Sequence, residues 1–529
     1  MIKRNIFIIG LSVFLLTGMA GCTEWLDLKP ESEIILDDFW QSESDVESVL
    51  AACYRGLTED AVISRMIVWG ELRSDNLIVG NGFPNARYDM QKILEGDLIS
   101  TNAYSSWSSF YSVINYCNTL LYYAPKVVTR DINFTTSDLQ RIQAEALTLR
   151  AMSYFYLVRA YKEVPYLEEA SVTDIQDYSL PKVPEDTIIK HIISDLLTAR
   201  KYARSDFGVK AMNKGRITLN AVNTLLADVY LWKGDYNACV AACDLVIADK
   251  KIKLEESALT YTRVFYLGNS TESIFELQFN ENVQTNNTVK SLYGTSGRPT
   301  GEVSFPTTLA YNQLTNATGT YSPFNFKIST TVTESTKDIR AKDSYIPGEN
   351  YYVFKYAGLN RIENTTGPMT GSSSYYYRSN TSNWIIYRLS DLMLMKAEAL
   401  VQLNSESDLK SALALVNTTY LRSNAGQDSL LIVNYSTKAE MEKLVLRERQ
   451  RELLFEGKRW FDLVRLARRE NSTSTLNDFV NHKSAGNGIS LGAPVMDAMY
   501  MPISRSELEA NPNLKQNTYY EDLSSSSSR

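Results

Sequence analysis

Apolar residues recur at three- and four-residue spacing along most of this chain, which places them on one face of an α-helix. Asp37 or Asp38 can cap the first predicted helix, and Ser137 or Asp138 the third. Nearly all of the strong periodicity is helical, so the sequence predicts a mainly α fold. The predicted helices span 37–57, 105–124, 137–162, 185–205, 216–233, 235–249, 387–403, 407–421, 437–457 and 459–469.

Two neighbouring pairs of predicted helices have the pattern of tetratricopeptide units. In the first pair, 216–233 and 235–249 are separated by Gly234 and Asp235, and in the second, 387–403 and 407–421 are separated by a break at Asn404. Small residues at the facing positions allow two antiparallel helices to pack closely, and such units are stable only when they stack on neighbours. The full repeat consensus is not met, so we interpret these pairs as degenerate repeats.

The helical pattern is interrupted by two irregular stretches, 74–104 and 250–385. Ser, Thr, Asn and Gly dominate the second stretch, and only short strand-like runs such as Ser273 to Phe279 and Tyr351 to Tyr356 occur in it. Long irregular segments in a helical chain usually carry its function. Trp107 and Trp384 border helical periodicity, and we therefore expect both in the core.

The N-terminus has the pattern of an export and lipidation signal. Lys3 and Arg4 precede an apolar run from Ile6 to Leu16, and Met19-Ala20-Gly21-Cys22 follows. The apolar run is too short to span a bilayer, and small residues directly before a cysteine resemble a bacterial lipobox, in which that cysteine is acylated. We therefore predict a signal peptide over 1–21 and a lipid-anchored Cys22. Ordinary secretion with a chance cysteine is the alternative.

Composition excludes several classes of function. The chain carries 54 basic and 61 acidic side chains, a net charge of -7, which argues against nucleic-acid binding. Only two histidines occur, so a histidine-based metal site is not expected. The remaining cysteines lie in apolar helical patterns and predict buried free thiols: Cys53, Cys117, Cys239 and Cys243. The 33 tyrosines suit both helix packing and stacking on sugar rings.

No catalytic motif is present in the sequence. It has neither a GxSxG elbow nor a phosphate-binding GxxxxGK[ST] loop. Glu448, Glu452 and Glu456 follow one another at four-residue steps among arginines, a pattern typical of an ion-paired helix surface or a packed charged seam. We therefore assign no catalytic residue, although an unrecognised carboxylate pair on a surface enzyme stays open as an alternative.

Several sequence blocks, taken in order, resemble the SusD/RagB family of nutrient-binding surface lipoproteins. The resemblance covers nearly the whole mature chain, and its most specific part lies in the C-terminal half. The blocks are Cys22 to Pro30 with Trp25-Leu26-Asp27, the helix with Phe39 and Asp45, Gln143 to Pro165, Gly215-Arg216 with Leu226-Ala227 and Tyr230, Tyr387-Arg388 with Ala397-Glu398-Ala399-Leu400, Glu448-Arg449 to Asp462-Leu463, and Met501-Pro502-Ile503 with Asn511 to Asn517.

The resemblance implies a right-angled superhelix of four tetratricopeptide-like helix pairs that supports a large loop-rich lobe with short strands. It implies non-catalytic binding of a glycan without a cofactor, a lipid anchor in the outer membrane, an outward-facing position and a SusC-like TonB-dependent transporter as partner. The expected divisions are a 1–21 signal peptide, a 22–36 tether, a 37–250 helical part with the 74–104 insertion, a 251–385 ligand lobe, a 386–523 helical part and a 524–529 disordered tail.

Ligand-binding candidates come from the two irregular stretches, because a sugar needs aromatic platforms together with polar groups that bind its hydroxyls. Asp75 and Asn76 have an alternative interpretation, the shaping of a turn. A peptide ligand, or a scaffold whose helices grip a partner protein, are alternative functions. The candidates are Asp75, Asn76, Phe83, Asn85, Arg87 and Tyr88 in the first stretch, and Tyr311, Tyr321, Phe324, Tyr375, Tyr376 and Tyr377 in the second.

Overall fold

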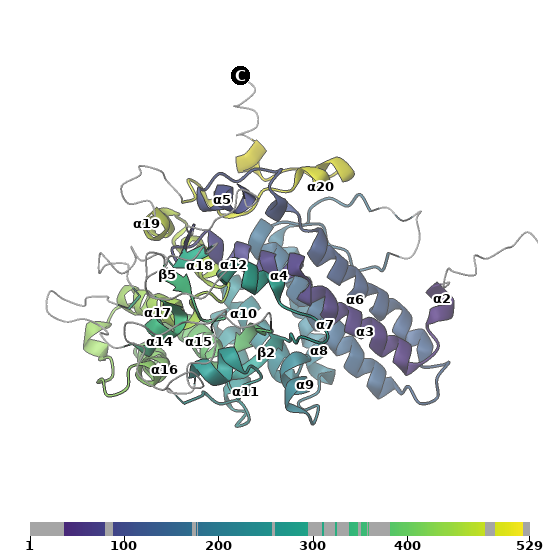
Figure 1. Cartoon of the computed structure of the whole chain (residues 1–529), viewed down its shortest axis with the longest axis horizontal. Coiled ribbons are helices and arrows are strands. Elements are labelled where there is room, and N and C mark those ends of the chain that lie inside the picture. Colours follow the sequence, from purple (N-terminus) through teal and green to yellow (C-terminus); the bar gives the residue numbers. More distant parts are fainter. Residues whose placement is uncertain are drawn as a thin grey trace, which may run out of the picture.

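The computed structural model describes residues 36–79, 88–171, 176, 178–256, 260–294, 309–311, 323–324, 338–346, 351–356, 358, 381–481 and 492–521. Within these ranges the fold is mainly α, as the periodicity predicted (Figure 1). The helices are α2 (Leu36–Phe39), α3 (Glu43–Thr58), α4 (Asp60–Ile67), α5 (Tyr88–Leu94), α6 (Ser108–Val127), α7 (Thr136–Tyr161), α8 (Glu185–Tyr202), α9 (Lys210–Gly215), α10 (Leu219–Lys233), α11 (Tyr236–Ile247), α12 (Asn287–Tyr293), α14 (Ile339–Ser344), α15 (Leu389–Leu403), α16 (Glu406–Ser423), α17 (Lys438–Leu453), α18 (Arg459–Glu470), α19 (Ser474–Asn481) and α20 (Arg505–Ala510).

Long helices pack as pairs that stack along the molecule. The pairs are α3 with α6, α7 with α8, α10 with α11, and α15 with α16. Successive pairs also touch, because α6 contacts α7, α8 contacts α10, and α11 contacts α15. In Figure 1 the N-terminal pairs lie at the right and the α15 to α17 group lies at the left. This stacking is the superhelix of tetratricopeptide-like units that the sequence predicted.

Two predicted helix caps are wrong, because capping boxes at neighbouring residues take their place. The first predicted helix is broken between α2 and α3, where Ser42 forms a capping box with Asp45, so neither Asp37 nor Asp38 caps α3. Thr135 caps α7 through a capping box with Asp138. In both places a Ser or Thr three residues before an Asp satisfies the free N–H groups of the first turn.

In the part of the chain that the structure describes, the strands form two small sheets. β1 (Leu77–Val79), β3 (Leu309–Tyr311), β5 (Tyr351–Val353) and β4 (Tyr345–Ile346) make an antiparallel sheet in the order β1-β3-β5-β4. β2 (Ser273–Leu277) pairs with β6 (Trp384–Arg388) in the second sheet. The sequence predicted β2 and β5 but placed the start of a helix in β6, where a run of aromatic and β-branched residues instead forms a fully buried strand.

The core contains the aromatic residues that the sequence placed there. Trp107 is 3% exposed and Trp384 is 1% exposed, which confirms both predictions. The four predicted thiols are free and buried, as expected: Cys53, Cys117, Cys239 and Cys243. Over the described ranges, no helix combines the length and apolarity needed to cross a membrane.

Candidate functional site

The two irregular stretches of the sequence meet in one sheet. Leu77 on β1 pairs with Tyr311 on β3, and Val79 pairs with Leu309. β3 in turn pairs with β5, so that Tyr311 lies opposite Tyr351. This pairing joins segments more than two hundred residues apart into a single structure, which we call the loop lobe: β1, β3, β4, β5 and the helices α5 and α14.

A close backbone contact ties the loop lobe to the helical frame. Gly70 lies in the π-helical turn η2 (Val68–Leu72), and a Cβ atom at this position would lie 1.9 Å from the carbonyl oxygen of Gly457. Gly457 has a φ of 70°, in the region that favours glycine. Two glycines therefore let the turn before β1 lie directly against the loop between α17 and α18.

That contact places the Glu71 side chain at the N-terminus of α18. Its carboxylate accepts hydrogen bonds from the backbone N–H groups of Phe455, Gly457 and Lys458 and from the side-chain amide of Asn76, at 2.7–3.3 Å. Burial raises the pKa of Glu71 to about 7, although the hydrogen bonds from Asn76, Phe455 and Lys458 oppose the rise. The Glu71 carboxyl group therefore pairs buried backbone N–H groups of the loop that leads into α18.

Asp75 and Asn76 are internal connectors, and the structure corrects their assignment as ligand contacts. Both are 0% exposed. Asp75 accepts two hydrogen bonds from Arg459, at 2.8 and 2.9 Å, and Gln450 donates to both Asp75 and Asn76. These contacts hold both side chains inside the protein. The structure therefore agrees with the alternative interpretation, in which Asp75 and Asn76 shape the turn into β1.

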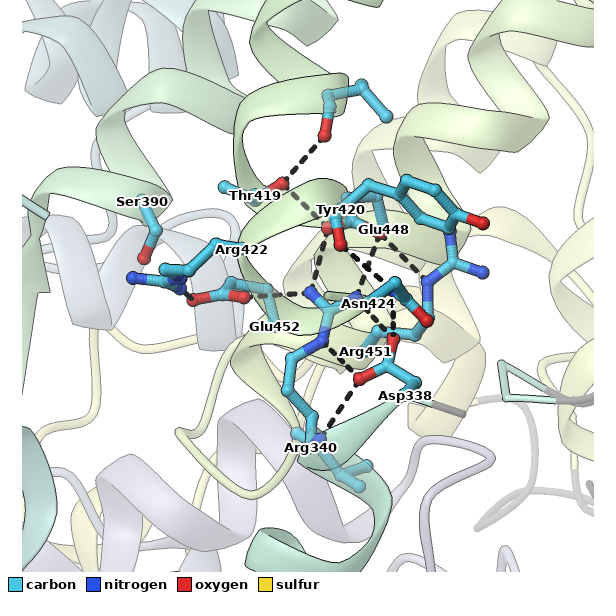
Figure 2. A network of polar contacts seen from close by, with 12 residues as sticks. Asp338, Arg340, Ser390, Thr419, Tyr420, Arg422, Asn424, Glu448, Arg451 and Glu452 are labelled. Atoms are coloured by element: carbon cyan, nitrogen blue, oxygen red, sulfur yellow. Dashed lines mark hydrogen bonds and ion pairs between the residues drawn. The ribbon is translucent and has the colours of Figure 1, made fainter. Parts of the chain in front are cut away.

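A buried set of charges joins α14 of the loop lobe to α17 (Figure 2). Arg340 points at the α17 carboxylates and donates to Glu448 at 2.7 Å and to Glu452 at 2.8 Å. Asp338 accepts two further hydrogen bonds from the same guanidinium, at 2.9 and 2.6 Å. We call this set and its extension the interlobe charge network: Glu272, Asp338, Arg340, Lys355, Arg388, Arg422, Glu448, Glu452 and Glu456.

Arg388 is the centre of the extension. It is 1% exposed and donates to Glu456 at 2.9 and 2.7 Å, to Glu452 at 2.5 Å and to Glu272 at 2.7 Å. Lys355, which follows β5, also donates to Glu456, at 2.6 Å. Arg340 and Lys355, both in the second irregular stretch, therefore bind carboxylates that lie on α17 or just after it.

The ion pairs decide the ionisation of Glu452 and Glu456. Burial opposes the charged form of Glu452, but Arg422, Arg388 and Arg340 outweigh it and hold its pKa well below the usual range. The pKa of Glu456 is also lowered, because Arg388 and Lys355 outweigh its burial. Of the two predicted arrangements, the packed charged seam is the one that the structure contains.

These carboxylates do not form an open acid–base pair. Glu448, Glu452 and Glu456 are at most 3% exposed, and each accepts hydrogen bonds from cationic side chains. The cavity beside Arg388 and Arg422 has a volume of about 30 Å³, enough for one water molecule but too small for a sugar ring. A glycosidase needs two carboxyl groups that flank a bound sugar. A sugar cannot reach the carboxylates of Glu448, Glu452 and Glu456.

Comparison with known families assigns both halves of the chain. Residues 271–520 match the model described as "SusD family", and residues 24–231 match the model described as "Starch-binding associating with outer membrane". The chain belongs to the SusD family. A curated SusD relative, "SusD-like protein P38" of Formosa agariphila, is 26% identical over 98% of this chain and 99% of its own.

Solved SusD structures share the fold over nearly their whole length. A SusD superfamily protein from Bacteroides vulgatus matches with a TM-score of 0.71 at 20% identity, covering 91% of this chain and 99% of its own. A structure named "Laminarin binding SusD-like protein" matches with a TM-score of 0.66 at 20% identity, over 91% and 100% of the two chains. NanU of B. fragilis matches with a TM-score of 0.66 at 20% identity, over 93% and 99%.

The structure places only some of the predicted ligand residues of this SusD chain. Tyr88 begins α5 and is 56% exposed, and Lys92 lies over its ring at 5.4 Å. Tyr311 is on β3, next to β1. Phe324 is 5% exposed and packs near Tyr345, so it is a core residue and not a ligand platform. The other candidates lie outside the described residues: Phe83, Asn85, Arg87, Tyr321, Tyr375, Tyr376 and Tyr377.

Sequence reasoning missed the residues that fix the SusD loop lobe in place. Arg340 and Lys355 lie in the stretch predicted to be irregular, and no periodic pattern marks them. Gly70 and Glu71 lie just before the first irregular stretch. A buried contact between these residues and the C-terminal helices leaves no local signal, because the partners are far apart in the chain.

Proposed function

We propose that this SusD-family chain captures an oligosaccharide at its loop lobe, without chemical change to the sugar, and delivers it to a SusC-like TonB-dependent transporter in the outer membrane. The observation that supports this best is the pairing of β1 with β3, which brings the two aromatic-rich stretches together. The matched family description, starch binding associated with the outer membrane, and the laminarin-binding relative support the ligand class.

The chemistry of the proposed site is that of a rigid platform. Glu71, Arg340 and Lys355 fix the base of the loop lobe through buried hydrogen bonds, and a fixed base lowers the cost of ordering loops around a ligand. Tyr88 and Tyr311 stay in the proposed contact set with the candidates outside the described residues. Aromatic faces stack on sugar rings while amide and guanidinium groups bind hydroxyls, so the site needs no cofactor.

Replacing Tyr88 with alanine is expected to weaken oligosaccharide binding about tenfold, because an exposed ring on a fixed helix is removed. Retardation of the mature protein in native gels that contain laminarin or starch measures the loss. Tyr202→Ala is the matched control, since Tyr202 is 43% exposed on α8. Equal retardation of the two variants and the unmodified protein would exclude Tyr88 from the site.

The lipid anchor proposed at Cys22 is tested by a single substitution. Cys22→Ala removes the only thiol of the lipobox pattern, so the protein is expected to leave the membrane fraction or to retain its signal peptide. An acylated lipoprotein carries enough hydrocarbon for stable anchoring. Fractionation and intact-mass analysis measure the outcome, and a normally processed, membrane-bound variant would contradict the proposed anchor.

A further inference from the structure

We propose a second saccharide-binding site in a groove between α3, α9 and the end of β2, outside the loop lobe. The groove has a volume of about 600 Å³, within the range of small-ligand sites, and α9 packs directly against β2. Figure 1 shows α9 and β2 next to each other near the N-terminal helix pairs. The ligand class rests on the glycan-binding function proposed above, but the site and its residues are different.

Three side chains that line the groove are held in place at their polar ends. The Tyr54 hydroxyl donates to buried Glu145 at 2.6 Å and accepts from the backbone N–H of Ile217 at 2.9 Å. Gln284 donates to the carbonyl oxygen of Thr58 at 2.9 Å and accepts from its hydroxyl at 3.0 Å. A ring and an amide that are already fixed lose little conformational entropy when a ligand binds.

Gln278 is the third fixed side chain, and Gly215 makes room for it. The amide nitrogen of Gln278 donates to the carbonyl oxygen of Ala211 at 2.6 Å and to Asn269 at 2.8 Å. A Cβ atom on residue 215 would lie 2.4 Å from that nitrogen and 2.8 Å from the amide carbon. Both amide protons are therefore committed inside the protein, and the amide oxygen is the atom left to accept from a ligand hydroxyl.

Charge balance favours a neutral ligand over an acidic one. Arg216 lines the groove but donates to Glu145 at 2.9 and 2.7 Å and lies 3.3 Å from Glu47. Arg55 has a side chain that is 77% exposed and faces Glu59 at 3.7 Å. Because each cation has a carboxylate beside it, no excess positive charge selects an anion, while their N–H groups suit sugar hydroxyls.

The shape of the floor completes the site. Ala51 and Ala52 lie on the groove side of α3, where their small side chains let a flat ring approach the helix. Met212, 37% exposed, and Val283, 84% exposed, form apolar edges. A fixed tyrosine, amide and guanidinium groups and weakly apolar edges together match a segment of a neutral oligosaccharide.

Hydrogen exchange of the full mature chain with laminarihexaose, maltoheptaose and xylohexaose as probes tests this site. We expect slower exchange of the backbone amide hydrogens of residues 48–58 and 277–284 when at least one of these oligosaccharides is present. Ala51→Trp places an indole on the groove floor from an exposed position and is expected to abolish this protection. Ser44→Trp, on the same exposed side of α3 but outside the groove lining, is the matched control and is expected to keep it.

The outcomes separate the two proposals. Slower exchange in the groove that is lost in Ala51→Trp but kept in Ser44→Trp supports the second site. If the groove is protected in this way while residues 77–94 are not, the result contradicts the loop-lobe site alone. Protection of 77–94 without the groove, or groove protection that Ala51→Trp leaves unchanged, overturns the second site alone. No protection in either region with any probe counts against both.

Discussion

Replacing Arg388 with methionine is expected to lower the free energy of unfolding by about 3–5 kcal/mol at pH 7, because a buried ion-pair partner is removed while the carboxylates stay. Methionine keeps most of the side-chain length, so the charge is the main change. In the variant, Glu452, Glu456 and Glu272 each lose a guanidinium donor at 2.5–2.9 Å. Urea unfolding followed by circular dichroism measures the difference.

The same variant has a defined pH dependence. The folded-state pKa values of Glu452 and Glu456 lie below their usual range, so the stability they contribute is present above the unfolded pKa near 4.5 and is lost as the pH falls through the folded values. The difference between the unmodified protein and Arg388→Met is therefore expected to shrink below about pH 4.5. A stability difference that stays constant as the pH falls from 7 to about 3 would contradict this electrostatic origin.

Arg505→Met is the matched control for Arg388→Met. Arg505 forms an ion pair with Glu509 on α20, with side chains that are 69% and 64% exposed. Water screens such a pair, and its loss is expected to cost about 0.3–0.5 kcal/mol. An equal loss of unfolding free energy in Arg388→Met and Arg505→Met would contradict the view that burial makes the ion pairs of the interlobe charge network strongly stabilising.

Replacing Gly70 with alanine is expected to cost about 3–5 kcal/mol, because overpacking and the loss of hydrogen bonds to the buried Glu71 carboxyl group add up. The new Cβ would lie 1.9 Å from the carbonyl oxygen of Gly457, a backbone atom with no flexible side chain to move aside. η2 must therefore shift, and the bonds from three backbone N–H groups to Glu71 are expected to break. Urea unfolding measures the loss.

Gly426→Ala separates this clash from the general effect of losing a glycine. Gly426 has a φ of 79°, but a Cβ atom there would meet nothing within 4 Å. Its replacement is expected to cost about 1–2 kcal/mol, from backbone strain alone. A Gly70→Ala variant no less stable than Gly426→Ala would mean that η2 adapts without breaking the Glu71 contacts.

The helical part of the fold could be predicted because its signal is local. α10 and α11 begin and end within three residues of the predicted ranges, since three- and four-residue spacing is a property of each helix itself. The predicted caps were less accurate than the helix ranges, because Ser42 and Thr135 are the N-cap residues of α3 and α7. The last two residues of β6 were assigned to the following helix, because a short apolar run fits both periods.

The loop lobe could be predicted only as a region. Leu77 and Tyr311 pair across more than two hundred residues of sequence, and no spacing in either segment encodes that partner. Asp75 had the composition of a ligand residue, yet Arg459, 384 residues later, determines that it is buried. A polar residue in a loop therefore cannot be assigned to a ligand or to an internal contact until its partner is known.

The most direct test of glycan capture is calorimetric titration of the mature chain with a panel of neutral and acidic oligosaccharides. The account predicts saturable binding, with a dissociation constant in the micromolar to millimolar range, for at least one of them, and weaker binding after Tyr88→Ala. A protein that unfolds cooperatively yet gives no saturable heat with any member of the panel would contradict the account.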